Sequence, residues 1–148
     1  MIRTVFAVAA VATVALGVTA VVAQQDPIAA RKALMKANGD QARIGGQMTR
    51  GEAPFDVAKA HLVFTTYAES ADKVGILFPD NSKTGGDTAA DPKIWQNKAD
   101  FDAKLKKFGD DAKAAGPATK DLDSFKANYA NVMRNCGGCH ETYRAKKS

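Results

Sequence analysis

The strongest constraint on the fold is a helical repeat of apolar residues that runs through four stretches of the chain. We predict helices from Asp26-Pro27 to about Thr49, from Pro54–Asp56 to a point before Pro79, from Asp91-Pro92 to about Gly116-Pro117, and from about Thr119 onward. An aspartate followed by a proline is a typical helix start. The polar segment Pro79–Ala90 is predicted to be a loop, and no part of the chain reads as a strand.

Apolar residues recur every three or four positions within these stretches and give each helix one apolar face. In the fourth stretch this face comprises Leu122, Phe125, Tyr129, Val132, Cys136, Cys139 and Tyr143. Amphipathic helices joined by short turns bury such faces against one another. The predicted class is therefore all-α, with the architecture of an antiparallel four-helix bundle.

The only two cysteines lie near the C-terminus, in the segment Cys136-Gly-Gly-Cys139-His140. A C-x-x-C-H pattern is typical of c-type haem attachment. On a helix, Cys136 and Cys139 share one face and can form thioethers to two porphyrin vinyl groups, while His140 can offer a ring nitrogen to the iron. We therefore predict one covalently bound haem c, buried between the helices near one end of the bundle.

Other uses of these residues agree less well with the sequence. A structural zinc site needs four ligands, and the only further histidine is His61. A thioredoxin-like dithiol needs a βαβ context, and a disulfide across two residues would close too short a loop to add much stability. His61 is also not expected to ligate haem iron, because it lies beside the apolar face of the second helix, where a partly exposed surface histidine is typical.

The first residues resemble a secretory signal peptide. Arg3 is followed by an uncharged, mostly apolar run from Thr4 to Ala23, and Val21-Val22-Ala23 offers small residues for cleavage before Gln24. We predict a signal peptide over residues 1–23, a single domain over residues 24–148, and export to the periplasm without a membrane anchor after cleavage. The run is also long enough to span a bilayer, so an uncleaved anchor is the alternative.

The charge of the chain is mildly basic. The net charge of +5 falls to about +4 once Arg3 is removed. This excess suits docking to acidic redox partner proteins, but it lacks the dense basic stripe expected of a nucleic-acid-binding protein. The basic C-terminal residues would also stabilise a helix end without any partner.

The mature chain resembles the class II cytochromes c, the family of cytochrome c prime and cytochrome c-556. The resemblance rests on Cys136-Gly-Gly-Cys139-His140 with Tyr143-Arg144, Arg31-Lys-Ala-Leu-Met35-Lys, Gly51-Glu-Ala-Pro-Phe-Asp56, Leu77-Phe-Pro79, and Gly85-Gly-Asp with Pro92-Lys-Ile-Trp95. It implies that His140 is the proximal iron ligand, that Arg31 meets a haem propionate, and that Arg144 is the basic residue beside the proximal histidine. It also implies a homodimer, often built from the first two helices.

The residue on the distal side of the iron decides between two functions. The resemblance places Met35 there, and a coordinating thioether would give a low-spin electron carrier. In that case the protein makes no bond in a substrate and is not an enzyme. The alternative is a high-spin protein with an open or displaceable sixth site that binds nitric oxide or carbon monoxide.

The sequence allows two further hypotheses about the distal side of the haem. If the neighbouring face of the first helix points inward, Leu34 blocks the iron and Met35 fills the core. A peroxidase or reductase activity would need distal acid–base groups, and none is convincingly placed on the first helix.

Overall fold

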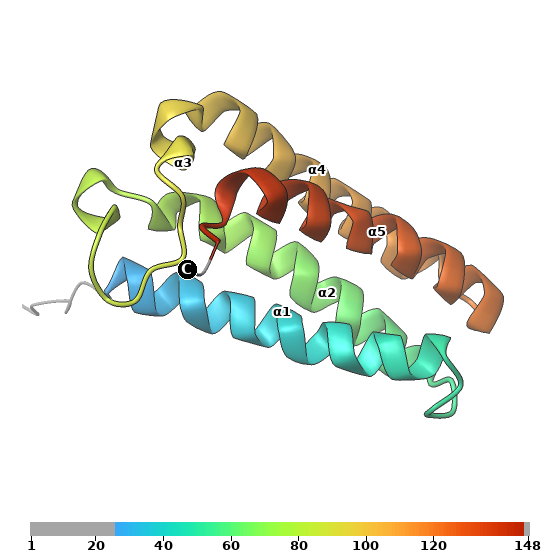
Figure 1. The fold of residues 1–148 in the computed structure, drawn as a ribbon. Helices are drawn as coiled ribbons and strands as arrows, with labels where there is room; N and C mark the ends of the chain where they lie inside the picture. The colour runs from blue at the N-terminus through green and yellow to red at the C-terminus, as the bar shows by residue number, and fades with distance from the viewer. Residues whose placement is uncertain (1–25, 147–148) are drawn as a thin grey trace, which may run out of the picture.

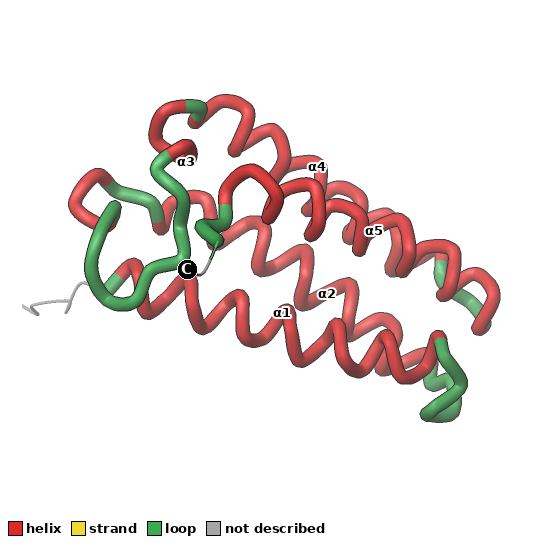
Figure 2. Tube along the Cα trace, viewed as in Figure 1, coloured by secondary structure: helices red, strands yellow, loops and turns green. Residues whose placement is uncertain are grey.

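The computed structural model describes residues 26–146 and is a bundle of four long helices. These are α1 (Pro27–Thr49), α2 (Val57–Val74), α4 (Lys98–Ala118) and α5 (Leu122–Tyr143). Successive long helices run in opposite directions (Figure 1), and the described segments that are not helical are loops (Figure 2). The predicted all-α, antiparallel four-helix bundle is thus confirmed. The predicted signal peptide lies outside the described residues.

Local capping explains where the helices begin. The carboxylate of Asp26 accepts a hydrogen bond from the Ile28 backbone N–H at 2.9 Å, so α1 starts as predicted. At α5, Asp121 and Ser124 form a reciprocal capping box. The helix therefore begins two to three residues after the predicted start at Thr119, whose buried hydroxyl donates to the carbonyl of Ala115 instead.

The predicted third helix is broken in the structure. It consists of a short helix α3 (Lys93–Gln96) and the long helix α4, separated by Asn97 with φ −124° and ψ 51°. The break turns Trp95 so that its indole N–H donates to the carbonyl of Phe78 at 2.9 Å. At the other end, Pro117 lies in the last turn of α4, and the helix ends one residue later.

The segment between α2 and α3 contains two short 3₁₀ turns, η1 (Gly75–Leu77) and η2 (Asp80–Ser82). Gly85, Gly86 and Asp87 follow with φ values of 89°, 53° and 52°, a left-handed conformation that glycine adopts most easily. The loop then reaches the end of α5, where Asp91 N–H donates to the carbonyl of Tyr143 at 2.9 Å.

The buried core falls into two clusters. The larger is built from α1, α2, α4 and α5 and consists of Met48, Ala60, Val63, Phe64, Tyr67, Ala68, Ala112, Ala115, Phe125, Tyr129 and Val132. The smaller joins α3, α4 and the end of α5 through Ile94, Phe101 and Tyr143. α2 and α4 pack most extensively, whereas α1 and α5 share far fewer contacts than α1 with α2 or α4 with α5.

Candidate functional site

The C-x-x-C-H segment lies within the last turns of α5, between the two core clusters. Both cysteines are partly buried free thiols, and burial raises the pKa of each, so both thiols are neutral near pH 7. Cys136 is close enough to the buried phenols of Tyr67 and Tyr129 to influence their pKa values. Cys139 packs against the smaller cluster. One helical turn therefore presents two unbridged thiols, which is the redox state that thioether formation requires.

His140 follows on the same turn and is exposed. Partial desolvation of the ring lowers its pKa, and the positive charge of Arg144 lowers it further. The imidazole is therefore neutral near pH 7, which is the form that ligates iron. Arg144 caps α5, and its backbone N–H donates to the carbonyl of His140 at 3.2 Å.

Helix α1 faces α5 in an antiparallel register fixed by one close contact. The Tyr129 hydroxyl donates to the carbonyl of Ala42 at 2.6 Å. The ring of Tyr129 lies against Gly45, where an added Cβ would stand 2.4 Å from a ring carbon, so a larger residue would not fit. Equal rise along both helices then places His140 level with about residue 33, within one turn of Met35.

The facing stretches of α1 and α5 are unusually poor in buried residues. In the described chain, α1 has none between Arg31 and Gly45, and α5 has none between Val132 and Tyr143. Along the bundle, both stretches lie between two points. One is the Tyr129–Ala42 contact, and the other is the loop between α2 and α3, which binds Arg31 and reaches the end of α5. A bundle helix normally buries one face along its length. These two faces therefore lack an apolar partner at the level of the C-x-x-C-H turn.

The distal candidates differ in burial. Met35 is 38% exposed and belongs to neither core cluster, so it does not act as a core filler. Leu34 is half-buried and lies one helical turn before Asn38, on the same face of α1. The amide N–H of Asn38 donates to Ser70 on α2 at 2.9 Å. Both residues stand within about a turn of the level of His140 on the facing helix.

Arg31 is buried and bound to the loop between α2 and α3. Its two terminal nitrogens donate to the carbonyl oxygens of Leu77 and Ser82 and to the hydroxyls of Ser82 and Thr88, at 2.7 to 2.8 Å. The guanidinium also lies 4.8 Å from the ring centroid of Phe78. These four bonds use every terminal N–H, so the predicted propionate contact would have to use Nε or displace a loop bond.

His61 is exposed on α2, and its Nε2 lies 3.0 Å from the carbonyl of Thr119. Thr119 joins α4 to α5 at the end of the bundle opposite the C-x-x-C-H turn. His61 is therefore a surface histidine, as the sequence predicts.

Two buried polar atoms on α1 support a bound group in this region. Asn38 Oδ1 and Gln41 Oε1 are shielded from solvent and have no hydrogen-bond partner in the described chain. Such orphaned acceptors are rare in folded proteins and indicate a missing ligand or water. Together with the two thiols, the neutral imidazole and the uncovered faces of α1 and α5, they fit a flat prosthetic group held inside the bundle beside these two helices.

Sequence reasoning missed the roles of Tyr129, Gly45, Asn38 and Gln41. Gly45 could have indicated a close helix approach, but its partner on α5 depends on the register between helices that are far apart in the chain. Asn38 and Gln41 are polar residues on a helix whose inward face could not be assigned from the sequence.

These features define a helical-bundle cytochrome of the c type. A sequence model of the family described as Cytochrome C' matches residues 26–144. The chain is 47% identical over 135 residues to cytochrome c' of Rhodopseudomonas palustris, covering 91% of this chain and 92% of that one. It is 34% identical to cytochrome c-556 of the same organism, covering 99% of both chains.

A solved structure of Rhodopseudomonas palustris cytochrome c' superposes with a TM-score of 0.81 at 46% identity and covers 84% of this chain and 100% of that one. The chain therefore belongs to the cytochrome c' family, within the class II cytochromes c, and carries one covalently attached haem c with iron.

Proposed function

We propose that this protein carries electrons in the periplasm, with haem c attached at Cys136 and Cys139, His140 as the proximal ligand and Met35 as the distal ligand. The bound haem supplies a one-electron couple between ferric and ferrous iron. The protein's own residues hold the group in place, exclude water and keep a neutral imidazole available. The proposed role is that of a carrier, not an enzyme.

Met35 is best supported as the distal ligand by its height along α1 relative to His140 and by its exposed side chain. Met35 lies within about a turn of the height of His140 along the facing helix, and it is not used in either core cluster. A thioether in this position is free to coordinate, and a soft axial ligand raises the reduction potential of haem iron.

A second candidate function is the binding of nitric oxide or carbon monoxide at an open or displaceable sixth site. Leu34 favours it, because this half-buried apolar residue lies near the same level and cannot ligate iron. The higher identity to a cytochrome c' than to a cytochrome c-556 also favours it. In this case Arg144 would shape the proximal pocket from its position beside His140.

Export is part of the proposal. The signal-like residues 1–23 and the covalent haem both suit the periplasm. Among residues 26–146, no helix is long and apolar enough to cross a membrane.

The optical spectrum of the purified holoprotein decides between the two functions. It is recorded oxidised and reduced, before and after addition of carbon monoxide. A low-spin spectrum that ignores the gas supports electron transfer with Met35 as ligand. A high-spin spectrum that changes with the gas supports the second function, and the absence of a haem spectrum from a host that matures c-type cytochromes would overturn both.

A further inference from the structure

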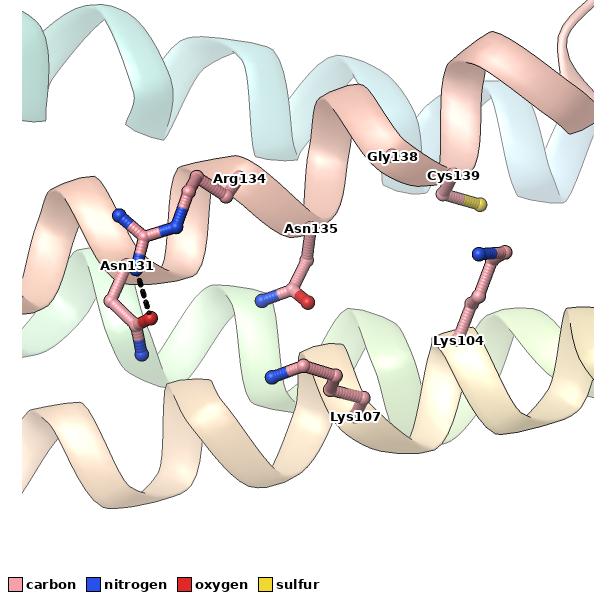
Figure 3. A pocket seen from close by; sticks show the side chains of 7 residues that line it. All are labelled: Lys104, Lys107, Asn131, Arg134, Asn135, Gly138 and Cys139. Carbon is pink, nitrogen blue, oxygen red and sulfur yellow. Dashed lines mark hydrogen bonds between the residues drawn. The ribbon is translucent and has the colours of Figure 1, made fainter.

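A recess of about 270 Å³ lies between α4 and α5, beside the C-x-x-C-H turn. Its walls include Lys104 and Lys107 of α4 and Asn131, Arg134, Asn135 and Cys139 of α5. Figure 3 shows the Lys104 side chain reaching from α4 to a position near the Cys139 sulfur, whereas the Lys107 side chain lies along α4. We call this surface the α4–α5 recess.

Two cations of the recess lack strong internal partners. The nearest carboxylate to Lys104 is that of Asp100, at 4.0 Å. Asp100 already accepts a hydrogen bond from the Tyr143 hydroxyl at 2.6 Å. Arg134 donates to the neutral amide oxygen of Asn131 at 2.6 Å and forms no ion pair within residues 26–146. Its charge reaches Asp111 only at longer range, as the weakest of the influences that lower the pKa of that carboxylate.

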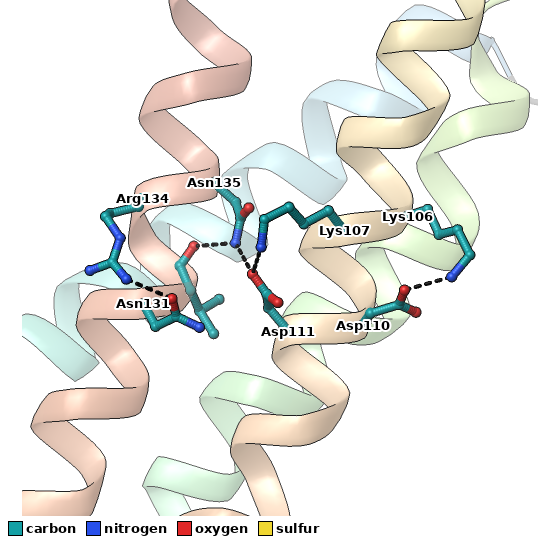
Figure 4. A network of polar contacts seen from close by, with 8 residues as sticks. Lys106, Lys107, Asp110, Asp111, Asn131, Arg134 and Asn135 are labelled. Atoms are coloured by element: carbon teal, nitrogen blue, oxygen red, sulfur yellow. Dashed lines mark hydrogen bonds and ion pairs between the residues drawn. The ribbon is translucent and has the colours of Figure 1, made fainter.

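The third cation is neutralised and belongs to the wall itself. Lys107 pairs with Asp111 at 2.6 Å, and Asn135 donates to the same carboxylate at 2.8 Å (Figure 4). The Asp111 side chain is only 20% exposed, so this network ties α4 to α5 and leaves little negative charge at the surface. The positive charge that remains at the recess is that of Lys104 and Arg134.

The outer side of the attachment turn is sterically open. A Cβ added at Gly137 or Gly138 would meet no atom within 4 Å. A partner surface can therefore approach the backbone between the two cysteines. Cys139 contributes both to the recess and to haem attachment, so a partner seated here comes close to a covalent link to the haem.

We propose that the α4–α5 recess is the docking site for an acidic segment of the redox partner protein, with Lys104 and Arg134 pairing its carboxylates. This inference rests on the proposed electron-carrier function. One electron passes between the partner's redox centre and the haem c on the Cys139 side, one centre is oxidised as the other is reduced, and no bond is made or broken. The cationic and amide lining does not suit an apolar partner helix.

Exposed ion pairs contribute little affinity individually, but a local positive field steers an anionic partner and raises its association rate at low ionic strength. The kinetic test uses the holoprotein with two small redox reagents, hexacyanoferrate as an anion and a cobalt amine complex as a cation. Lys104→Glu and Arg134→Glu should each slow electron exchange with the anion by about three- to tenfold at low salt and speed exchange with the cation. Both effects should vanish at high salt.

Lys59→Glu is the matched control, because Lys59 also has a long ion pair, at 3.9 Å to Asp56, but lies on α2 near the other end of the bundle. It should change either rate by less than about twofold. Equal effects of Lys59→Glu and Lys104→Glu would show that only the net charge matters and would overturn the proposal.

A binding experiment separates docking from redox function. A short polyglutamate peptide is titrated into isotope-labelled holoprotein, and backbone amide shifts are followed by NMR. Shifts concentrated between residues 131 and 139 that disappear in Lys104→Glu are expected. Their absence, or the same shifts with anionic lipid vesicles or single-stranded DNA and none with the peptide, would overturn the docking site. A normal haem spectrum in that case would leave the proposed function standing.

Discussion

At the scale of single residues, the distal side of the haem site depends on two neighbours on α1. Met35 and Leu34 differ by one position, which turns their side chains about 100° apart on a helix. Met35 has the chemistry of a ligand and is exposed, whereas Leu34 has neither property. The difference between an electron carrier and a gas-binding protein therefore reduces to which of the two side chains stands over the iron.

Met35→Ala is predicted to convert a low-spin spectrum into a high-spin one that responds to carbon monoxide, because the thioether ligand is lost. Leu34→Ala, which removes an apolar side chain from the same turn, should leave the spin state unchanged. The measurement is the visible spectrum of both oxidation states of each variant. A low-spin spectrum that survives in Met35→Ala would show that another group holds the sixth position.

Asp111 gives a pH-dependent contribution to stability. Hydrogen bonds from Lys107 and then Asn135 lower its pKa below the ordinary 3.8. Because the folded-state pKa is the lower one, the stabilisation is present above the unfolded-state pKa and is lost as the pH falls through the folded-state value. Asp111→Asn should therefore reduce the free energy of unfolding at pH 6, and the difference from wild type should shrink below about pH 4.

Urea unfolding of the holoprotein at both pH values measures this difference. Asp110→Asn is the matched control, since Asp110 also pairs with the lysine four residues before it but is 57% exposed. Its effect should be small at either pH. An Asp111→Asn difference that does not change with pH would contradict the assigned role of the carboxylate.

At the scale of elements, the sequence predicts most of the helices because their signals are local. The Asp26-Pro27 start and the apolar repeat of α2 depend on residues within a few turns of each other. The break at Asn97 has no such signal. It arises because Trp95 and Ile94 pack with Phe78 and Phe101, residues separated in the sequence. The C-x-x-C-H motif and its place on the last helix could be recognised from the sequence alone. The stretch of α1 that faces it could not, because that depends on the register between the two helices.

Arg31 links α1 to the loop between α2 and α3 and should keep that loop in a single conformation. Arg31→Ala removes four hydrogen bonds and leaves a buried carbonyl at Ser82 and a partly buried carbonyl at Leu77 without this donor. We expect a loss of about 2 to 4 kcal/mol in the free energy of unfolding. Faster amide hydrogen exchange over residues 77–90 should accompany it.

Lys32→Ala provides the control for Arg31→Ala. Lys32 is the next residue on α1, is exposed, and reaches the same loop through one long bond of 3.3 Å to the carbonyl of Gly86. Its removal should change exchange in the loop only slightly. Unchanged exchange in Arg31→Ala, together with an altered haem environment, would instead favour the propionate role that the family resemblance implies.

At the scale of the whole molecule, the two core clusters explain how the bundle can be stable although α1 and α5 make few contacts with each other. The larger cluster closes the end that contains the turns after α1 and α4, and the smaller one closes the end at α3. Between them α1 and α5 share few contacts, and the attachment turn lies there. The same arrangement leaves the outer faces of α1 and α2 available for a second copy of the chain.

The predicted homodimer can be tested at Leu62, which is 54% exposed on α2 and is flanked one turn away by the uncharged, exposed Ala58. If α1 and α2 form the dimer, Leu62→Glu places an unpaired carboxylate in the interface and should weaken association by about tenfold or more, which is at least about 1.4 kcal/mol.

Ile76→Glu is the matched control, because Ile76 is 84% exposed in η1, outside α1 and α2. Sedimentation of the holoproteins over a concentration series should give dimers for wild type and Ile76→Glu and a shift toward monomer for Leu62→Glu. A wild-type protein that sediments as a monomer throughout, or a stronger effect of Ile76→Glu, would contradict an interface on α1 and α2. Because the α4–α5 recess lies on the opposite pair of helices, a dimer through α1 and α2 would leave both recesses free for partner proteins.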